Sequence, residues 1–122
     1  MMDTCELIPA DDVCGLLCAL GAAKELRGYR YLSLAAELAV QVPERSVNEI
    51  LVIVAERFSV TVSSAESAMR KVIADSWSRD SDLAFRAKVF GNTVQFSRGK
   101  PSLREYITQI AGYVCMKRSG LL

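Results

Sequence analysis

The sequence has 122 residues, which suits a single domain with a sizeable hydrophobic core. Its hydrophobic content of 51% argues for a compact fold and against a disordered chain. No apolar run approaches the roughly 20 residues that span a bilayer, and the start lacks the basic region of a signal peptide. We therefore expect a cytoplasmic protein that does not contact a membrane.

Residue types that commonly carry catalysis or hold metals are scarce. The chain has no histidine, no glycine-rich phosphate loop, and neither an HExxH nor a nucleophile-elbow motif, so we do not expect an enzyme. The cysteines lack paired CxxC spacing and have no histidine to complete a zinc site, so we expect no metal and no cofactor. We expect all four to be small buried hydrophobic residues in a reducing compartment: Cys5, Cys14, Cys18 and Cys115.

The first part of the chain predicts a leader followed by two helices. Residues 1–8 are expected to form a flexible leader. A helix is predicted over Pro9–Leu20, where Gly21 supplies the stop. A second helix is predicted over Tyr29–Gln41, and Pro43 ends it because the residue before a proline avoids helical geometry.

The predicted helix starts carry residues that helix N-termini favour. Asp11 and Asp12 open the first helix, where their charge compensates the helix dipole. They could be taken for a catalytic pair, but adjacent helical residues point about 100° apart and do not converge on one atom. A third helix is predicted over Val47–Phe58, with Ser46 and Glu49 in the spacing of a capping box.

Residues 47–79 predict two helices joined by a turn too short for them to lie side by side. The first helical period stops at Ser59, and the small residue Ala55 allows the two helices to approach closely. Ser63 and Glu66 match a capping box at the start of the second helix. Such a corner is typical of a helix-turn-helix, whose second helix can enter the DNA major groove. An ordinary corner inside an all-α domain fits the pattern about equally well.

One face of this second helix is small, polar and basic. The face opposite Met69, with its two flanks, comprises Ser63, Ser64, Ser67, Arg70, Lys71, Ala74 and Ser78. Small side chains let the helix backbone approach a groove, and the two cations could reach bases or phosphates. A solvated helix face explains the same residues without any partner.

The C-terminal part predicts a short helix, a basic loop and a final helix. The short helix is predicted over Leu83–Phe90. Residues 93–100 break helical periodicity and carry Arg98 and Lys100. Ser102, with a glutamate three residues later, forms another capping box at the start of the last helix.

Together these elements predict a compact all-α single domain of about six helices over residues 9–122, with a helix-turn-helix at about 47–79. Its charge is unevenly divided along the chain. Residues 1–61 carry nine acidic and five basic side chains, whereas residues 62–122 carry five acidic and ten basic ones. This division suits a protein with one face that meets an anionic partner.

Several short motifs, in order, carry a family resemblance. The segments RGYRYL, VAERF, SSAES-AMRKVI, WSRD, VFGNTV and GKPSLREYI, between about Asp12 and Val114, resemble the C-terminal effector domain of the sporulation master regulator, the stage-zero sporulation protein A family. The resemblance implies an all-helical domain of about six helices whose fourth helix reads double-stranded DNA. It also implies that two copies bind adjacent repeats, as a homodimer on DNA, and act on RNA polymerase through its sigma subunit.

The resemblance extends to individual residues of the predicted DNA-reading helix. Ser63, Glu66 and Arg70 match family positions at or beside the bases, whereas Ser64 and Ser67 stand where the family has arginine. A bidentate arginine–guanine contact is worth about 1–3 kcal/mol, so these two departures imply a different target sequence or weaker binding.

Two further regions can be compared with the family. Arg98 and Lys100 match basic positions of the loop before the last helix, where phosphate contact is plausible. Residues 77–90 overlap the family's polymerase-contacting region, but their local sequence differs. The chain starts with MMDTCELIP and has no room for the family's receiver domain, so we expect a stand-alone effector-like domain or a fragment.

Two functions follow. The first is a DNA-binding transcription regulator, with six residues facing the groove and three facing phosphates: Ser63, Ser64, Glu66, Ser67, Arg70 and Lys71, then Arg98, Lys100 and Arg104. The second is a protein–protein interaction module that keeps the fold, has lost specific DNA reading, and modulates sigma factor, polymerase or a full-length regulator. The near-neutral net charge of +1 and the two serine-for-arginine departures favour this alternative.

Overall fold

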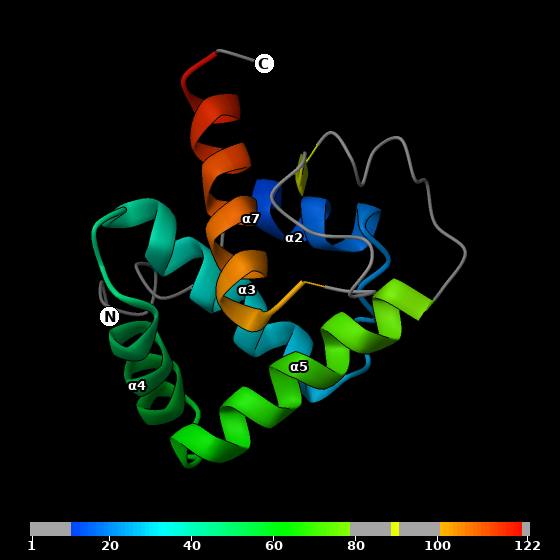
Figure 1. The fold of residues 1–122 in the computed structure, drawn as a ribbon, viewed down its shortest axis with the longest axis vertical. Coiled ribbons are helices and arrows are strands. Elements are labelled where there is room, and N and C mark those ends of the chain that lie inside the picture. The colour runs from blue at the N-terminus through cyan, green and yellow to red at the C-terminus, as the bar shows by residue number, and fades with distance from the viewer. Residues whose placement is uncertain (1–10, 79–88, 91–100, 121–122) are drawn as a thin grey trace.

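The computed structural model describes residues 11–78, 89–90 and 101–120. These ranges form a compact all-α domain without a strand, which confirms the predicted fold class. The helices, labelled in Figure 1, are α2 (Asp11–Ala19), α3 (Arg27–Gln41), α4 (Val47–Arg57), α5 (Val62–Ser78) and α7 (Leu103–Arg118). The predicted leader, most of the predicted helix at Leu83–Phe90 and the predicted extended segment at 93–100 lie outside the described residues.

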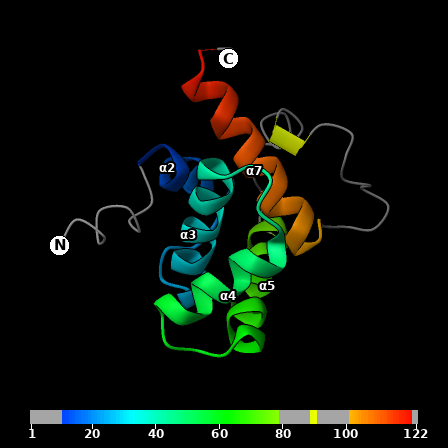
Figure 2. The same cartoon turned by 90° about the vertical axis from the view of Figure 1, so that its left-hand side faces the viewer.

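Helix α3 is the centre of the domain. It packs against each of the other four described helices. Every residue from Tyr31 to Leu38 is buried, as expected for a helix surrounded by others. Figure 2 shows α2 on one side of α3 and α7 on the other, with the α4–α5 corner at the lower end of the molecule.

Local signals in the sequence set the ends of several helices. Ser46 and Ser102 each form the predicted capping box, with Glu49 and Glu105 as reciprocal partners. Helix α2 ends at Ala19, one residue before the predicted end, and the predicted stop Gly21 has a φ of 93°, which suits a residue without a Cβ atom. The N–H of the next residue donates to the carbonyl of Leu17 at 3.0 Å, which completes a Schellman motif.

A three-helix ion-pair cluster joins α2, α3 and α7. The guanidinium of Arg118 donates from Nε to Asp12 Oδ2 at 2.7 Å and from Nη2 to Glu37 Oε1 at 2.9 Å. Glu37 has a side chain only 8% exposed, so Arg118 supplies the charge that this carboxylate needs inside the protein. The hydrogen bond from Arg118 lowers the pKa of Asp12 below its ordinary value. Asp12 therefore has a tertiary partner in addition to its predicted place at a helix start.

The cysteines are less buried than predicted. Cys14, Cys18 and Cys115 are free thiols, each half-buried, while Cys5 lies outside the described residues. Cys18 Sγ lies 3.3 Å from the hydroxyl of Tyr29, which donates to the carbonyl of Cys14 at 3.1 Å. Burial, followed by the contact with Cys18, raises the pKa of the Tyr29 hydroxyl. Among the described residues no group of acidic, histidine or cysteine side chains is arranged to hold a metal ion.

Candidate nucleic-acid interface

The corner between α4 and α5 is held by backbone hydrogen bonds. Ser59 has a φ of 57°, and the next residue, Val60, donates its N–H to the carbonyl of Ala55 at 2.9 Å. This is a Schellman motif in which serine occupies the left-handed position that glycine usually takes. The chain leaves α4 and enters α5 within four residues, so the axes of the two helices diverge from the corner, as Figure 1 shows.

The predicted capping box at Ser63 is wrong. The side chain of Thr61 caps α5, because its Oγ1 accepts the backbone N–H of Ser64 at 3.0 Å. Helix α5 therefore begins at Val62, and Ser63 lies inside its first turn. Glu66 instead forms an ion pair with Arg70, one turn further along the helix.

Helix α5 has one buried side and one exposed side. The buried side packs into the core through Ala65, Met69, Val72, Ile73 and Ser76. On the other side four residues of the predicted groove face are exposed, namely Ser63, Ser67, Arg70 and Lys71. Ser64 and Glu66 are half-buried at its margins. The structure thus brings all six predicted groove residues onto the part of α5 that is not in the core.

The charge of this face is positive. The side chain of Arg70 is 65% exposed, while that of its partner Glu66 is 32% exposed. Because the two side chains form an ion pair, the positive charge of Arg70 balances the negative charge of Glu66. Lys71 is exposed and forms no ion pair with any described carboxylate, so it contributes a full positive charge to the face.

The start of α7 lies beside this face. A hollow of about 300 Å³ is lined by Arg70 and Ile73 of α5 and by Pro101, Ser102 and Leu103. Arg104, in the first turn of α7, is exposed. Of the three predicted phosphate-contacting residues, Arg104 is thus on an element next to α5. Arg98 and Lys100 lie outside the described residues.

Two exposed arginines beside the corner were not singled out by sequence reasoning. The guanidinium carbon of Arg30, on α3, lies 5.6 Å from the ring centroid of Phe58, and that of Arg57 lies 5.7 Å from the same centroid. A helical wheel identifies both as solvent-facing cations. It does not reveal that residues 28 positions apart meet at one ring, because this depends on how α3 packs against the corner.

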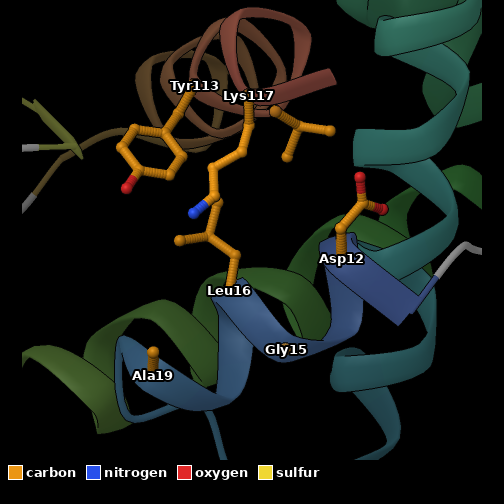
Figure 3. Close-up of a pocket in the computed structure, with 7 residues that line it drawn as sticks. Asp12, Gly15, Leu16, Ala19, Tyr113 and Lys117 are labelled. Atoms are coloured by element: carbon orange, nitrogen blue, oxygen red, sulfur yellow. The ribbon is translucent and has the colours of Figure 1, made fainter. Parts of the chain in front are cut away.

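A second hollow lies away from the corner, between α2 and α7. It has a volume of about 220 Å³ and is lined by Asp12, Gly15, Leu16, Ala19, Tyr113, Val114 and Lys117. Figure 3 shows Tyr113 and Lys117 descending from α7 towards Leu16 of α2. Its acidic group, Asp12, is already paired with Arg118, and the hollow contains none of the predicted site residues.

The all-α fold and the exposed, positively charged side of α5 define the chain as a small helical domain of the kind that DNA-binding regulators use. The model of one family, described as "Sporulation initiation factor Spo0A C terminal", matches residues 13–114. The chain therefore belongs to this family, whose members are non-catalytic DNA-binding effector domains of transcription regulators. Among the described residues no helix is both long enough and apolar enough to cross a bilayer.

Proposed function

We propose that this chain is a sequence-specific DNA-binding transcription regulator in which α4 and α5 form a helix-turn-helix and α5 enters the major groove. The observation that carries the proposal is the solvent-facing side of α5. It presents small serines in its first two turns and two cations one turn later. Small side chains permit close approach of the helix to base edges, and the N-terminal end of a recognition helix is the part that contacts bases.

The residues of this face have distinct roles in the proposal. Ser63, Ser64 and Ser67 lie nearest the helix start, where their hydroxyls can donate to or accept from base edges or phosphates. Arg70 is the base-reading cation, and its pairing with Glu66 orients the guanidinium. Lys71 serves as a point charge for the DNA backbone.

Arg104 supports a second line of contact. It is exposed at the start of α7, which borders the same hollow as Arg70. Arg98 and Lys100 precede this helix in the sequence, and we propose that all three contact phosphates. Membership of the family also leads us to propose binding as a homodimer on adjacent repeats and action through the RNA polymerase sigma subunit.

The proposal predicts moderate sequence discrimination. Ser64 and Ser67 cannot make the bidentate guanine contact that arginine makes, which is worth about 1–3 kcal/mol. Specific binding typically exceeds non-specific binding by about 4–10 kcal/mol. We therefore expect a target sequence or an affinity that differs from those of family members with arginine at these positions.

Fluorescence anisotropy with labelled duplexes tests this function. We expect binding that weakens steeply between about 50 and 200 mM salt, because cations that contact phosphates release counterions. The Lys71→Ala variant should bind all duplexes more weakly. Lys117→Ala is the matched control, because Lys117 lies at the far end of α7 beside α2. Absence of binding to any duplex at about 50 mM salt would contradict the proposal.

A protein–protein interaction module is the second candidate. It is favoured by Ser64 and Ser67, which lack the long cations of the family, and by Val52 on α4, which is 46% exposed. In this case the chain would capture sigma factor, polymerase or a full-length regulator in a pull-down without showing affinity for DNA. If the chain captures those partners and also binds DNA in a salt-sensitive way, the first candidate is favoured.

A further inference from the structure

We propose that Arg30 and Arg57, held over the ring of Phe58, form a second DNA contact that takes backbone phosphates beside the start of α5. This inference rests on the proposed function, because it assigns charge to the DNA-facing side of the same helical corner. We name Arg30 and Arg57 the Phe58 arginine pair, after the ring that both cations face.

The aromatic ring is a firm support for the two cations. Phe58 is half-buried and packs against the hydrophobic core. Its ring centroid lies 4.7 Å from that of Tyr31, which is 4% exposed. The ring is therefore held from the inside, and its π-system attracts the guanidinium groups of Arg30 and Arg57. One arginine of α3 and one of α4 thus both lie near the ring of Phe58.

The pair lacks a counter-charge of its own. Arg30 and Arg57 are exposed, and neither forms an ion pair with a carboxylate in the described ranges. The nearest acidic side chain in the sequence, Glu56, is also exposed and adjoins Arg57 on α4. Their guanidinium carbons lie 5.6 and 5.7 Å from one ring centroid, so the corner carries two positive charges that no described carboxylate balances, and a nearby anion is attracted to both. Guanidinium groups match phosphate oxygens in geometry, so phosphate is the ligand that this arrangement favours.

The position of the pair points to DNA as the source of that phosphate. Phe58 is the C-cap of α4, and α5 begins at Val62 after a short turn. The pair thus lies at the end of α4, one short turn before the start of α5, which is the end of α5 that would enter the groove. A major groove is bordered by the phosphates of both strands. A helix whose first turns carry serines can therefore obtain its cations from the neighbouring helices α3 and α4.

The experiment compares the salt dependence of DNA binding among variants. Arg30→Ala and Arg57→Ala should each reduce the slope of log K against log salt by about 0.9, and the double variant by about twice that amount. Each should weaken binding to all duplexes alike, because phosphate contacts carry no sequence information. Arg45→Ala is the matched control. Arg45 lies between α3 and α4 and donates to the carbonyl of Leu38 at 3.3 Å, so the slope should not change.

Lysine variants separate charge from packing. Arg30→Lys and Arg57→Lys keep the positive charge and should retain the wild-type slope, while circular dichroism checks that every variant is folded. If the lysine variants lose as much of the slope as the alanine variants, the arginines act through packing and the inference is overturned. If the wild type binds DNA and the double alanine variant keeps its slope, this inference alone fails. If the wild type binds no DNA, both this inference and the proposed function fail.

Discussion

Gly28 of α3 and Ala68 of α5 meet backbone to backbone. A Cβ atom on Gly28 would lie 2.1 Å from the carbonyl oxygen of Ala68 and 2.8 Å from Cγ2 of Val72. No real Cβ contact is this short, and the first obstacle is main chain, which cannot rotate away. The absence of a side chain at Gly28 therefore sets how deeply α5 sits on α3, and with it how the serine- and cation-bearing face is presented.

Replacement of Gly28 by alanine should force α3 and α5 apart. We expect a loss in the free energy of unfolding of about 3 kcal/mol or more, at the upper end of overpacking effects. Gly112→Ala is the control, because a Cβ atom there meets nothing within 4 Å. The free energy of unfolding of Gly112→Ala should rise by about 0.5–1 kcal/mol, because alanine has a higher helix propensity than glycine. Urea unfolding of both variants measures the difference, and equal effects of the two substitutions would contradict the close contact.

Loss of Arg118 should leave Glu37 buried without its charged partner. We expect Arg118→Ala to lower the free energy of unfolding by about 1–3 kcal/mol, a value reduced from that of a fully buried pair because Arg118 is partly exposed. Lys117→Ala, one position earlier and exposed, should change it by about 0.5 kcal/mol or less. Thermal unfolding distinguishes the two. If Arg118→Ala leaves the free energy of unfolding unchanged, the cluster contributes nothing to the packing of α2, α3 and α7.

The ion pair at Asp12 should make the stability of the protein depend on pH in the acidic range. The pKa of Asp12 is lowered in the folded protein from 3.8, mainly by its hydrogen bond with Arg118. Its contribution is therefore complete above about pH 4 and is lost as the pH falls through the lowered pKa. The stability difference between wild type and Asp12→Asn should shrink as the pH falls from neutral to acidic values. A difference that stays constant over that range would exclude this linkage.

The left-handed backbone at Ser59 offers a stabilising substitution. A residue with a Cβ atom is strained at a φ of 57°, whereas glycine is not. We expect Ser59→Gly to raise the free energy of unfolding by about 0.5–1 kcal/mol, and Ser59→Val to lower it, because β-branched side chains tolerate this conformation least. Differential scanning calorimetry checks the predicted order of stability, in which Ser59→Gly is the most stable, the wild type is intermediate and Ser59→Val is the least stable. A Ser59→Val variant as stable as Ser59→Gly would contradict it.

Sequence reasoning succeeded where the determinants are local. The capping boxes at Ser46 and Ser102, the stop at Gly21 and the amphipathic side of α5 depend on residues within about one or two helical turns of each other. The cap at Ser63 was wrong because Thr61 lies two residues earlier and reaches the same end of α5 first. Both serine and threonine are good caps, so the spacing to Glu66 was not decisive.

Long-range relationships were beyond the reach of sequence patterns. Asp12 and Arg118 are 106 positions apart, and nothing in the periodicity of either helix predicts their contact. The meeting of Arg30 with Phe58 likewise depends on the packing of α3 against the corner. The predicted groove residues share a helix, so their common face could be predicted, whereas the cations supplied by other helices could not.

The base-reading role of Arg70 can be separated from phosphate contact. Arg70→Ala should relax discrimination between duplexes by about 1–3 kcal/mol at the affected base pair, whereas Arg104→Ala should weaken binding to all duplexes similarly. Binding-site selection with each variant compares the two. If Arg70→Ala lowers every affinity by the same factor, Arg70 contacts phosphate and does not read bases.

The most direct measurement is a titration of isotope-labelled protein with duplex DNA, followed by backbone amide chemical shifts. We predict that the largest changes occur from Val62 to Lys71 and at the exposed start of α7, while the α2–α7 hollow around Leu16 and Tyr113 is unaffected. Changes confined to the α2–α7 side, or no changes at all at low salt, would contradict the central claim that α5 is the DNA-reading helix.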